Sequence, residues 1–514
     1  MKRIPIYLLL LGTVVNFSCD EQSLLNLSPQ TYQSSSSFFK SEEHFEQALI
    51  GVYSCLRSLP EYAVFMDEMR SDNTFFTFFA GDRSQALHAE SIAQFTDDDR
   101  ASYTTNRYTN NYVGISRANT ILDRITGFSD MEEATKNRIV AETLFLRAFF
   151  YFDLVSHYGG VPLQLAEITS EEGTFLPRAT EEEVYGQVIA DLILAIPGLP
   201  VAKEFPQSGR ASSGSAKMLL AYAYLTQPNK DYAKAAQELR DIEGMNYTLM
   251  ADYADCFDPA QKNSRESIFE IQYKEGNDGL HSYFTWLFIP KTPNTVLITG
   301  LNVATQHIRW GGWNVPTRDL VSTYEKGDKR LNASVAVAEG TEDANGTFLI
   351  ERVVNAEGYK PQPGKAYYYF VNKYNHSPYA VEYNTGENWP IFRYADALLL
   401  LAECLLEQGD QTGALRYVNQ VRNRAGLANL ATISKEAILK ERRHELAFEN
   451  HRWLDLIRAG KAVEVMQQFG AAVKSQYGWV LPNAFNVTPE KLIYPIPFRE
   501  LQINSNLVQN PGYQ

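Results

Sequence analysis

One stretch of the sequence approaches the spacing of a metal-dependent hydrolase. His444 and Glu445 match the start of a zinc-protease helix, in which a second histidine one turn later binds the metal and the glutamate activates a metal-bound water. Position 448 is Phe448, and the next histidine, His451, lies two turns from His444. We therefore interpret residues 441–455 as a partly buried network of ion pairs, without a metal.

The remaining acidic patterns do not single out a catalytic pair. The run Asp97–Asp99 lacks the spaced ligands and central glycine of a calcium loop, which favours a solvated acidic turn. A glycosidase needs two carboxylates across a sugar, and none of the 61 acidic residues stands out by context. Arg147 and Asp153 are interpreted as structural partners of neighbouring helices. We predict no catalytic residue, no metal and no cofactor.

Aromatic residues point instead to binding. The chain is 12% aromatic, with 30 Tyr and 28 Phe, and flat rings stack on the apolar face of a sugar. Tyr283, Trp286, Trp310 and Trp313 concentrate in a region rich in Gly, Pro and Asn. The run 74–79 contains four phenylalanines and is read as a buried strand, or alternatively as a loop that shows its rings to solvent.

These loops need a rigid support, and residues 138–163 predict its centre. Ala141, Phe145 and Phe152 recur at helical spacing, and further apolar residues widen the arc beyond that of a surface helix. A glycine pair followed by Pro162 ends the helix. We expect a buried helix packed among other helices.

Two helical hairpins indicate a repeat. Helices are predicted at 215–225 and 233–242, and the same apolar and alanine pattern returns without a gap at 398–406 and 414–424. Each hairpin turn contains an aspartate. Paired amphipathic helices with alanines at the crossing resemble tetratricopeptide units.

The chain divides by composition. A helical scaffold is predicted over about 41–245 and 390–460, a loop-rich, partly β insertion over about 246–389, and an extended segment over about 480–514. Within these parts, the spacing predicts helices at 41–58 and 107–125, a capped helix starting at Thr180, another starting at Ser434, and β-runs at 267–273 and 367–374.

The N-terminus has the features of a targeting segment. Lys2 and Arg3 precede an apolar run at 6–15 that is too short to span a bilayer, and Cys19 follows a small residue. Residues 1–18 resemble a lipoprotein signal, with Cys19 as the lipidated residue and 19–40 as anchor and tether; an ordinary secretory peptide is the alternative. The net charge of −14 argues against a nucleic-acid surface.

Several motifs occur together in an order that resembles one family. These motifs are Ala141–Val155, Tyr158–Pro162, Arg393–Glu403, Val421–Leu427, Glu441–Arg443, Glu445–Leu446, Arg452–Leu456 and Tyr494–Pro497. From Cys19 to its end the chain resembles the SusD/RagB nutrient-binding lipoproteins of Bacteroidota. Asn16 departs from the aliphatic residue usual in lipoprotein signals, and Tyr108 stands where many members of the family have Trp.

The resemblance implies a mostly α fold, in which residues 41–514 form one SusD-like domain on tetratricopeptide-like helix pairs. It implies a lipoprotein on the outer face of the outer membrane that captures an oligosaccharide and passes it to a SusC-like TonB-dependent transporter. It also implies an aromatic ligand site, which maps here to Asp72, Asn73, Phe75, Phe76, Phe78, Phe79, Tyr103, Tyr108, Tyr283, Trp286, Arg309, Trp310 and Trp313.

Two other functions remain open from the sequence. One is a helical glycoside hydrolase that acts on surface glycans, and the other is a structural scaffold that holds a transporter and binds no ligand. Under the binding hypothesis, Trp310→Ala or Trp313→Ala is expected to weaken glycan retention while leaving the fold intact.

Overall fold

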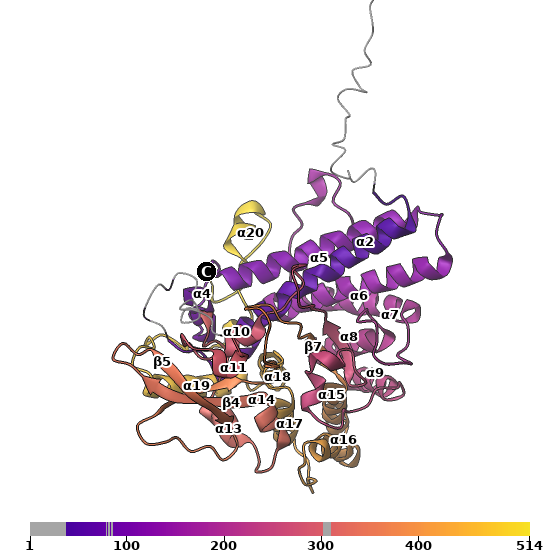
Figure 1. Cartoon of the computed structure of the whole chain (residues 1–514). Coiled ribbons are helices and arrows are strands. Elements are labelled where there is room, and N and C mark those ends of the chain that lie inside the picture. Colours follow the sequence, from indigo (N-terminus) through magenta and orange to yellow (C-terminus); the bar gives the residue numbers. More distant parts are fainter. Residues whose placement is uncertain (1–37, 79, 81–82, 84–85, 302–309, 514) are drawn as a thin grey trace, which may run out of the picture.

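Long helices form one side of the molecule (Figure 1). The structure is a computed structural model, and it describes residues 38–78, 80, 83, 86–301 and 310–513. The N-terminal helices are α2 (Glu42–Tyr53), α3 (Leu59–Ala63), α4 (Ala86–Ala93), α5 (Ser102–Thr126), α6 (Glu133–Tyr158) and α7 (Glu181–Ala195). The predicted signal and lipidation residues 1–18 and Cys19 lie outside the described residues.

Helix α6 is the buried helix that the sequence predicted. Phe145, Phe150 and Leu154 on this helix are fully buried, and its end is marked by Gly159, whose φ of +70° suits glycine. A Cβ added to Gly114 on α5 would lie 2.3 Å from the ring of Phe150, so a glycine is needed where the two helices cross. Both α5 and α6 start earlier than predicted.

The charged residues of α6 have structural partners, as expected. Arg147 pairs with Asp191 of α7 at 2.8 Å, and Asp153 pairs with Arg107 of α5 at 2.6 Å. All four side chains are nearly inaccessible to water. These pairs fix how α5, α6 and α7 lie against one another.

The predicted helical hairpins are present as α8 (Ser213–Thr226) with α9 (Tyr232–Glu243), and α15 (Tyr394–Glu407) with α16 (Gln411–Arg424). Asp231 and Asp410 cap the second helix of each pair by accepting a backbone N–H. Helix α9 also packs against α15, which brings the two hairpins side by side. The mostly α-helical, tetratricopeptide-like architecture is confirmed.

The strands form small antiparallel sheets. They are β1 (Thr74–Phe75), β2 (Ser267–Ile271), β3 (Val315–Pro316), β4 (Val335–Glu342), β5 (Phe348–Asn355), β6 (Ala366–Val371) and β7 (Trp389–Arg393). Their order is β1-β3, β2-β7 and β5-β4-β6. The predicted β-runs correspond to β2 and β6. The predicted strand at 74–79 is wrong in extent, because the β-strand covers only Thr74 and Phe75.

Shorter helices complete the insertion and the C-terminal part. They are α10 (Phe284–Phe288), α11 (Val296–Thr299), α13 (Arg318–Thr323), α14 (Lys329–Ser334), α17 (Lys435–Glu445), α18 (Arg452–Arg458), α19 (Ala462–Gln476) and α20 (Phe498–Ile503). The last segment contains a 3-10 helix (Pro489–Leu492) in addition to α20, and its other described residues are without regular structure. It is anchored by Tyr494, whose hydroxyl donates to the carbonyl of Met66 at 2.5 Å. Among the described helices none is long and apolar enough to cross a membrane.

The predicted ion-pair network lies in the interior and is confirmed. Arg393 contacts Glu266, Glu445 and Glu449 at 2.7, 3.0 and 2.7 Å. Each of these side chains is at most 2% exposed. A separate arginine, Arg442, pairs in the same way with Asp396 and Asp455. The network joins β7, α17 and the insertion.

Candidate functional site

A groove lined by aromatic side chains runs between four segments of the chain. We call it the aromatic groove; it has a volume of about 680 Å³. Its walls are residues 75–78, residues 315–319 around β3, residues 365–369 on β6, and residues 469–479 at the end of α19. This volume falls within the range of about 300–1,000 Å³ typical of ligand sites.

Residues 75–78, which form one wall of the groove, are held in place by backbone hydrogen bonds to residues 312–315. Phe75 lies opposite Val315 in the β1-β3 ladder, and the N–H of Thr77 donates to the carbonyl of Gly312 at 2.8 Å. Gly312 has a φ of +76°, and a Cβ there would lie 3.0 Å from Thr77. The close approach of these two segments therefore requires glycine at this position.

The aromatic rings are in continuous contact from the groove into the core. Trp479 stacks on Phe78 with centroids 4.6 Å apart and lies 5.2 Å from Phe76. Phe76 lies 5.8 Å from Trp313. The chain of contacts then passes through Phe65, which is 5.5 Å from Trp313 and 4.2 Å from Tyr103. The structure thus brings together five of the predicted site residues: Phe75, Phe76, Phe78, Tyr103 and Trp313.

Asp72 and Asn73 do not face the groove. The carboxylate of Asp72 is held by Arg452 at 2.7 and 2.9 Å and by Arg443 at 2.9 Å. Asn73 accepts from Arg443 and donates to Glu68. Both residues are buried, so their polar groups are committed to fixing the start of β1. This corrects their assignment as ligand contacts.

Three of the predicted aromatic contacts are also placed elsewhere. Trp286 is fully buried in a second hydrophobic cluster with Phe370 and Ile289. Tyr108 is 2% exposed and packs against Tyr158. Tyr283 is half-buried, and its hydroxyl donates to Glu61. Burial leaves Trp286 and Tyr108 without the free ring face that stacking on a sugar requires. Tyr283 keeps part of its surface, but none of the three residues lines the groove.

The two glycine-flanked tryptophans differ in exposure. Trp310 is 46% exposed, whereas Trp313 is 6% exposed and is packed among the groove aromatics. Trp310 does not line the groove. Phe79 and Arg309, the remaining predicted contacts, lie outside the described residues.

Sequence reasoning missed much of the groove. The unpredicted lining aromatics are Tyr367, Tyr368, Tyr369, Phe469, Tyr477 and Trp479. The signal for the last two was an aromatic pair around Gly478, directly after the last long helix. The signal for the first three was a tyrosine run, whose residue types by themselves predict only a β-strand.

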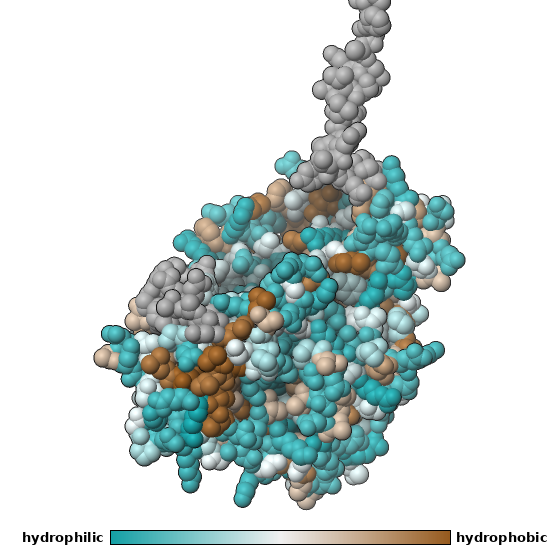
Figure 2. Space-filling model, in the orientation of Figure 1, coloured by the Kyte–Doolittle hydropathy of each residue, from teal (hydrophilic) through white to brown (hydrophobic). Residues whose placement is uncertain are grey.

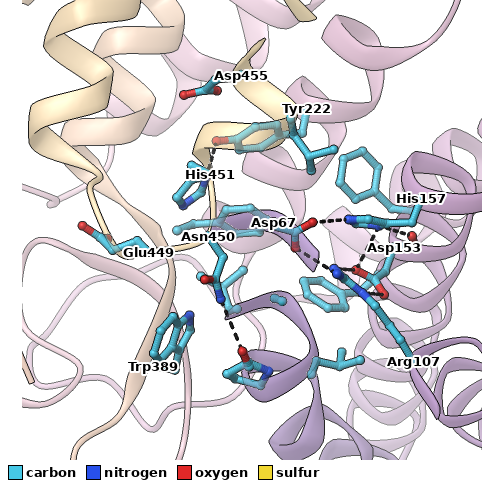
Figure 3. A pocket seen from close by; sticks show the side chains of 18 residues that line it. Asp67, Arg107, Asp153, His157, Tyr222, Trp389, Glu449, Asn450, His451 and Asp455 are labelled. Atoms are coloured by element: carbon cyan, nitrogen blue, oxygen red, sulfur yellow. Dashed lines mark hydrogen bonds and ion pairs between the residues drawn. The ribbon is translucent and has the colours of Figure 1, made fainter. Parts of the chain in front are cut away.

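A second pocket, of about 100 Å³ and lined mostly by buried residues, lies between α5, α6, β7 and α18 (Figure 3). Figure 3 shows Asp67, Arg107, Asp153 and His157 pointing toward one another. Arg107 bonds Asp67 at 2.9 Å, and His157 Nε2 lies 2.7 Å from Asp67. By the same measure this pocket is far smaller than the aromatic groove of about 680 Å³, so the groove is the better candidate for a ligand of oligosaccharide size.

Hydrophobic side chains gather on the face where α11 and β5 lie (Figure 2). Val296, Leu297 and Leu349 are exposed there by 42, 48 and 42%. A patch of aliphatic side chains lacks the rings and hydrogen-bonding groups that a sugar requires. The aromatic groove therefore fits the predicted aromatic ligand site better than this patch does.

The metal hypothesis finds no support at His444. Its Nε2 lies 3.0 Å from the hydroxyl of Thr323, and its ring stacks on Tyr324 at 4.2 Å. Burial, together with the charges of Arg330 and Arg443, lowers the pKa of His444 to about 2. Among the described residues, no group of three or more histidine, cysteine or acidic side chains is arranged to hold a metal.

This buried neutral histidine makes folding sensitive to acid. Unfolded His444 has a pKa of about 6.5, so below that pH the unfolded chain binds a proton that the folded chain rejects. The free energy of unfolding should therefore decrease as the pH is lowered below about 6.5, and the decrease should reach about 2–3 kcal/mol at about pH 4.5. We expect His444→Phe to remove this contribution. Urea unfolding at neutral pH and at about pH 4.5 measures this contribution. An equal loss of stability in acid for wild type and variant would contradict the assignment to His444.

Two family models match the chain. One, described as "SusD family", matches residues 265–513, and the other, described as "Starch-binding associating with outer membrane", matches residues 24–225. The chain is 26% identical to SusD-like protein P25 of Formosa agariphila over the full length of both. It is also 25% identical to Starch-binding protein SusD of Bacteroides thetaiotaomicron, covering 78% of this chain and 77% of that one.

Solved structures share the fold. A laminarin-binding SusD-like protein superimposes with a TM-score of 0.74 and 28% identity, over 92% of this chain and 100% of that chain. Surface glycan-binding protein A from Bacteroides thetaiotaomicron, solved with laminarihexaose, has a TM-score of 0.72 at 22% identity, over 91% of this chain and 99% of that chain.

Proposed function

We propose, from the premise that this chain belongs to the SusD family, that it binds an oligosaccharide in the aromatic groove and performs no chemistry on it. The observation that carries this proposal is the set of rings that line a groove of ligand size. Trp479, Tyr477 and Tyr367 are half-buried, so each keeps part of its ring available. Sugar C–H faces stack on such rings.

The polar groups of the groove suit binding better than hydrolysis. Among the described residues that line the groove, Asp319 is the one carboxylate, and Arg443 holds it at 2.8 Å. A glycosidase uses two carboxylates, one on each side of the scissile bond. The names of the relatives, starch-binding and laminarin-binding, also describe binding proteins. These observations support the binding function over the glycosidase alternative.

The proposal includes the location and partners that the resemblance implies. Residues 1–18 would serve as a lipoprotein signal, and Cys19 would carry the lipid that anchors residues 41–514 to the outer face of the outer membrane. The bound oligosaccharide would then pass to a SusC-like TonB-dependent transporter. The description of the N-terminal family model, which names association with the outer membrane, supports this location.

Replacing Trp479, whose ring contacts Phe76 and Phe78 in the groove, tests the function. Trp479→Ala should weaken retention of a bound glycan about 10- to 100-fold, because one ring-to-sugar stack is worth about 1–3 kcal/mol. Trp479→Phe should keep most of the retention, since a ring remains. The measurement is native affinity electrophoresis of the soluble chain, starting after Cys19, against laminarin, starch and a wider polysaccharide panel.

Phe175→Ala provides the matched control. Phe175 is an aromatic residue, 39% exposed, that does not line the groove. It should migrate as wild type in every gel. If Trp479→Ala also migrates as wild type in each glycan that retards wild type, the groove is not the binding site. Turnover of a labelled oligosaccharide by the wild type would instead favour the glycoside hydrolase alternative.

A further inference from the structure

The ionisable side chains that line the aromatic groove are not equally neutralised. Lys365 is paired with Glu351 at 2.6 Å, and Asp319 is paired with Arg443 at 2.8 Å. Arg318 lines the groove, is exposed, and has no ion pair with any carboxylate that the structure describes. Among the described residues that line the groove, Arg318 is therefore the guanidinium whose charge is available to a ligand.

Arg318 lies between opposite walls of the groove. Its guanidinium carbon is 5.2 Å from the centre of the Tyr367 ring on β6. Burial raises the pKa of both Tyr369 and Tyr477, and the charge of Arg318 opposes this rise at each of them. Tyr369 belongs to β6, and Tyr477 follows α19. The guanidinium is thus close to the rings that would hold a sugar from both sides.

Two carboxylates next to the groove are bound by residues of its walls. Glu342, at the end of β4, accepts from the hydroxyl of Tyr368. Glu351 accepts from Lys365 at the rim. Neither carboxylate lines the groove. An anion that enters the groove therefore meets Arg318 directly, without displacing a carboxylate from it.

A free arginine next to aromatic rings has a particular use in recognition. The guanidinium is planar, always charged, weakly hydrated, and presents two parallel N–H groups that match a carboxylate or a sulfate. The whole chain carries a net charge of −14, which repels acidic polymers. A local cation in the groove offsets that repulsion where the ligand binds.

We propose that the aromatic groove takes an acidic oligosaccharide, with Arg318 binding the anionic group of a sugar that the rings hold by stacking. The anionic group is a uronate carboxylate or a sulfate ester. This inference rests on the proposed function and adds the class of glycan to it.

The experiment compares polysaccharides that share a backbone and differ in charge. Polygalacturonate is paired with its fully methyl-esterified form, and dextran sulfate is paired with dextran; the first pair reports carboxylate recognition and the second reports sulfate recognition. Wild type, Arg318→Gln, Trp479→Ala and Arg416→Gln are titrated with each. Arg416 is a control because its side chain is 60% exposed and lies on α16, away from the β4–β5 side of the molecule (Figure 1).

Wild type is expected to bind at least one acidic member about tenfold or more tightly than its neutral counterpart. Arg318→Gln should lose about tenfold of that affinity, and Arg416→Gln should lose none. Raising NaCl from about 0.1 M to about 1 M shortens the screening length from about 10 Å to about 3 Å, so it should weaken wild type and leave Arg318→Gln nearly unchanged.

The outcomes separate this inference from the function on which it rests. If Trp479→Ala loses glycan binding while Arg318→Gln retains it, the groove binds a glycan and the acidic class is overturned. Equal or tighter binding of the neutral members, or no binding of either acidic polymer, also overturns the acidic class. If acidic polymers bind and Trp479→Ala has no effect, the groove itself is rejected as the site.

Discussion

Replacement of Arg393 by leucine is expected to lower the free energy of unfolding by about 3–5 kcal/mol. The guanidinium is fully buried and lies within 3.0 Å of Glu266, Glu445 and Glu449. Burial alone would raise the pKa of Glu449, and the charges of Arg393 and Lys373 more than offset it, so its pKa stays below the ordinary value. Without Arg393, the buried carboxylate of Glu449 would lose its largest counter-charge, and Glu266 and Glu445 would each lose one of their arginine partners.

Urea unfolding at neutral pH measures the loss. Arg393→Lys keeps the charge but not the branched hydrogen bonding, so it should be intermediate. Arg124→Leu is the matched control, because Arg124 pairs with Glu167 at the surface, where such pairs are worth about 0–1 kcal/mol. A loss below about 1 kcal/mol for Arg393→Leu would mean that water or rearrangement relieves the buried carboxylates.

The sign of the pH dependence also follows. A depressed carboxylate pKa stabilises the fold at pH values above the unfolded pKa of about 4.5, and this stabilisation disappears as pH falls through the folded pKa. The same holds for Glu445 and Asp455. Burial alone would raise their pKa values, but neighbouring arginines lower them more strongly, so both pKa values lie below the ordinary value. In the wild type, the stabilisation by this ion-pair network should therefore decrease as the pH falls below about 4.5.

Trp313→Ala is expected to cost about 3–5 kcal/mol of stability, whereas Trp310→Ala should cost less than about 0.5 kcal/mol. Trp313 is 6% exposed and contacts Phe65 and Phe76. Removing its indole would leave a cavity between the groove and the core. Trp310 lies three residues earlier, and nearly half of it faces solvent.

Thermal unfolding of the two variants side by side tests this contrast. The expectation that Trp313→Ala would leave the fold intact is corrected by its burial, so a loss of glycan retention in that variant would not identify a ligand contact. Trp313→Phe should recover part of the stability because a ring still fills the space. Equal melting temperatures for Trp310→Ala and Trp313→Ala would show that the indole of Trp313 is not part of the core.

The helices and their pairing could be read from the sequence. The capping box of Thr180 and Glu183 forms as predicted, and Ser434 caps α17. The repeated hairpins and the buried centre of α6 were found from the spacing of apolar residues. Helix formation depends on bonds between residues four apart and on one apolar face, and both leave a periodic signal in the chain.

The charged motifs that carried the resemblance are largely interior. Arg393, Arg442 and Asp455 belong to buried ion pairs, so they define the fold rather than the ligand. The same holds for Asp72 and Asn73, which were expected at the site and are held by arginines beneath it. A polar residue type indicates a partner, but it does not tell whether that partner is a ligand or another part of the chain.

The sequence by itself determined the helical repeats, the buried helix α6, the ion-pair network and the resemblance to one family. Only the tertiary structure decided which rings line the groove, because residues 75–78, 315–319, 365–369 and 469–479 are far apart along the chain and meet through long-range packing. Whether a ring faces solvent or core depends on what covers it. Trp310 and Trp313 are the same residue type three positions apart, and their different exposure follows from their neighbours in space.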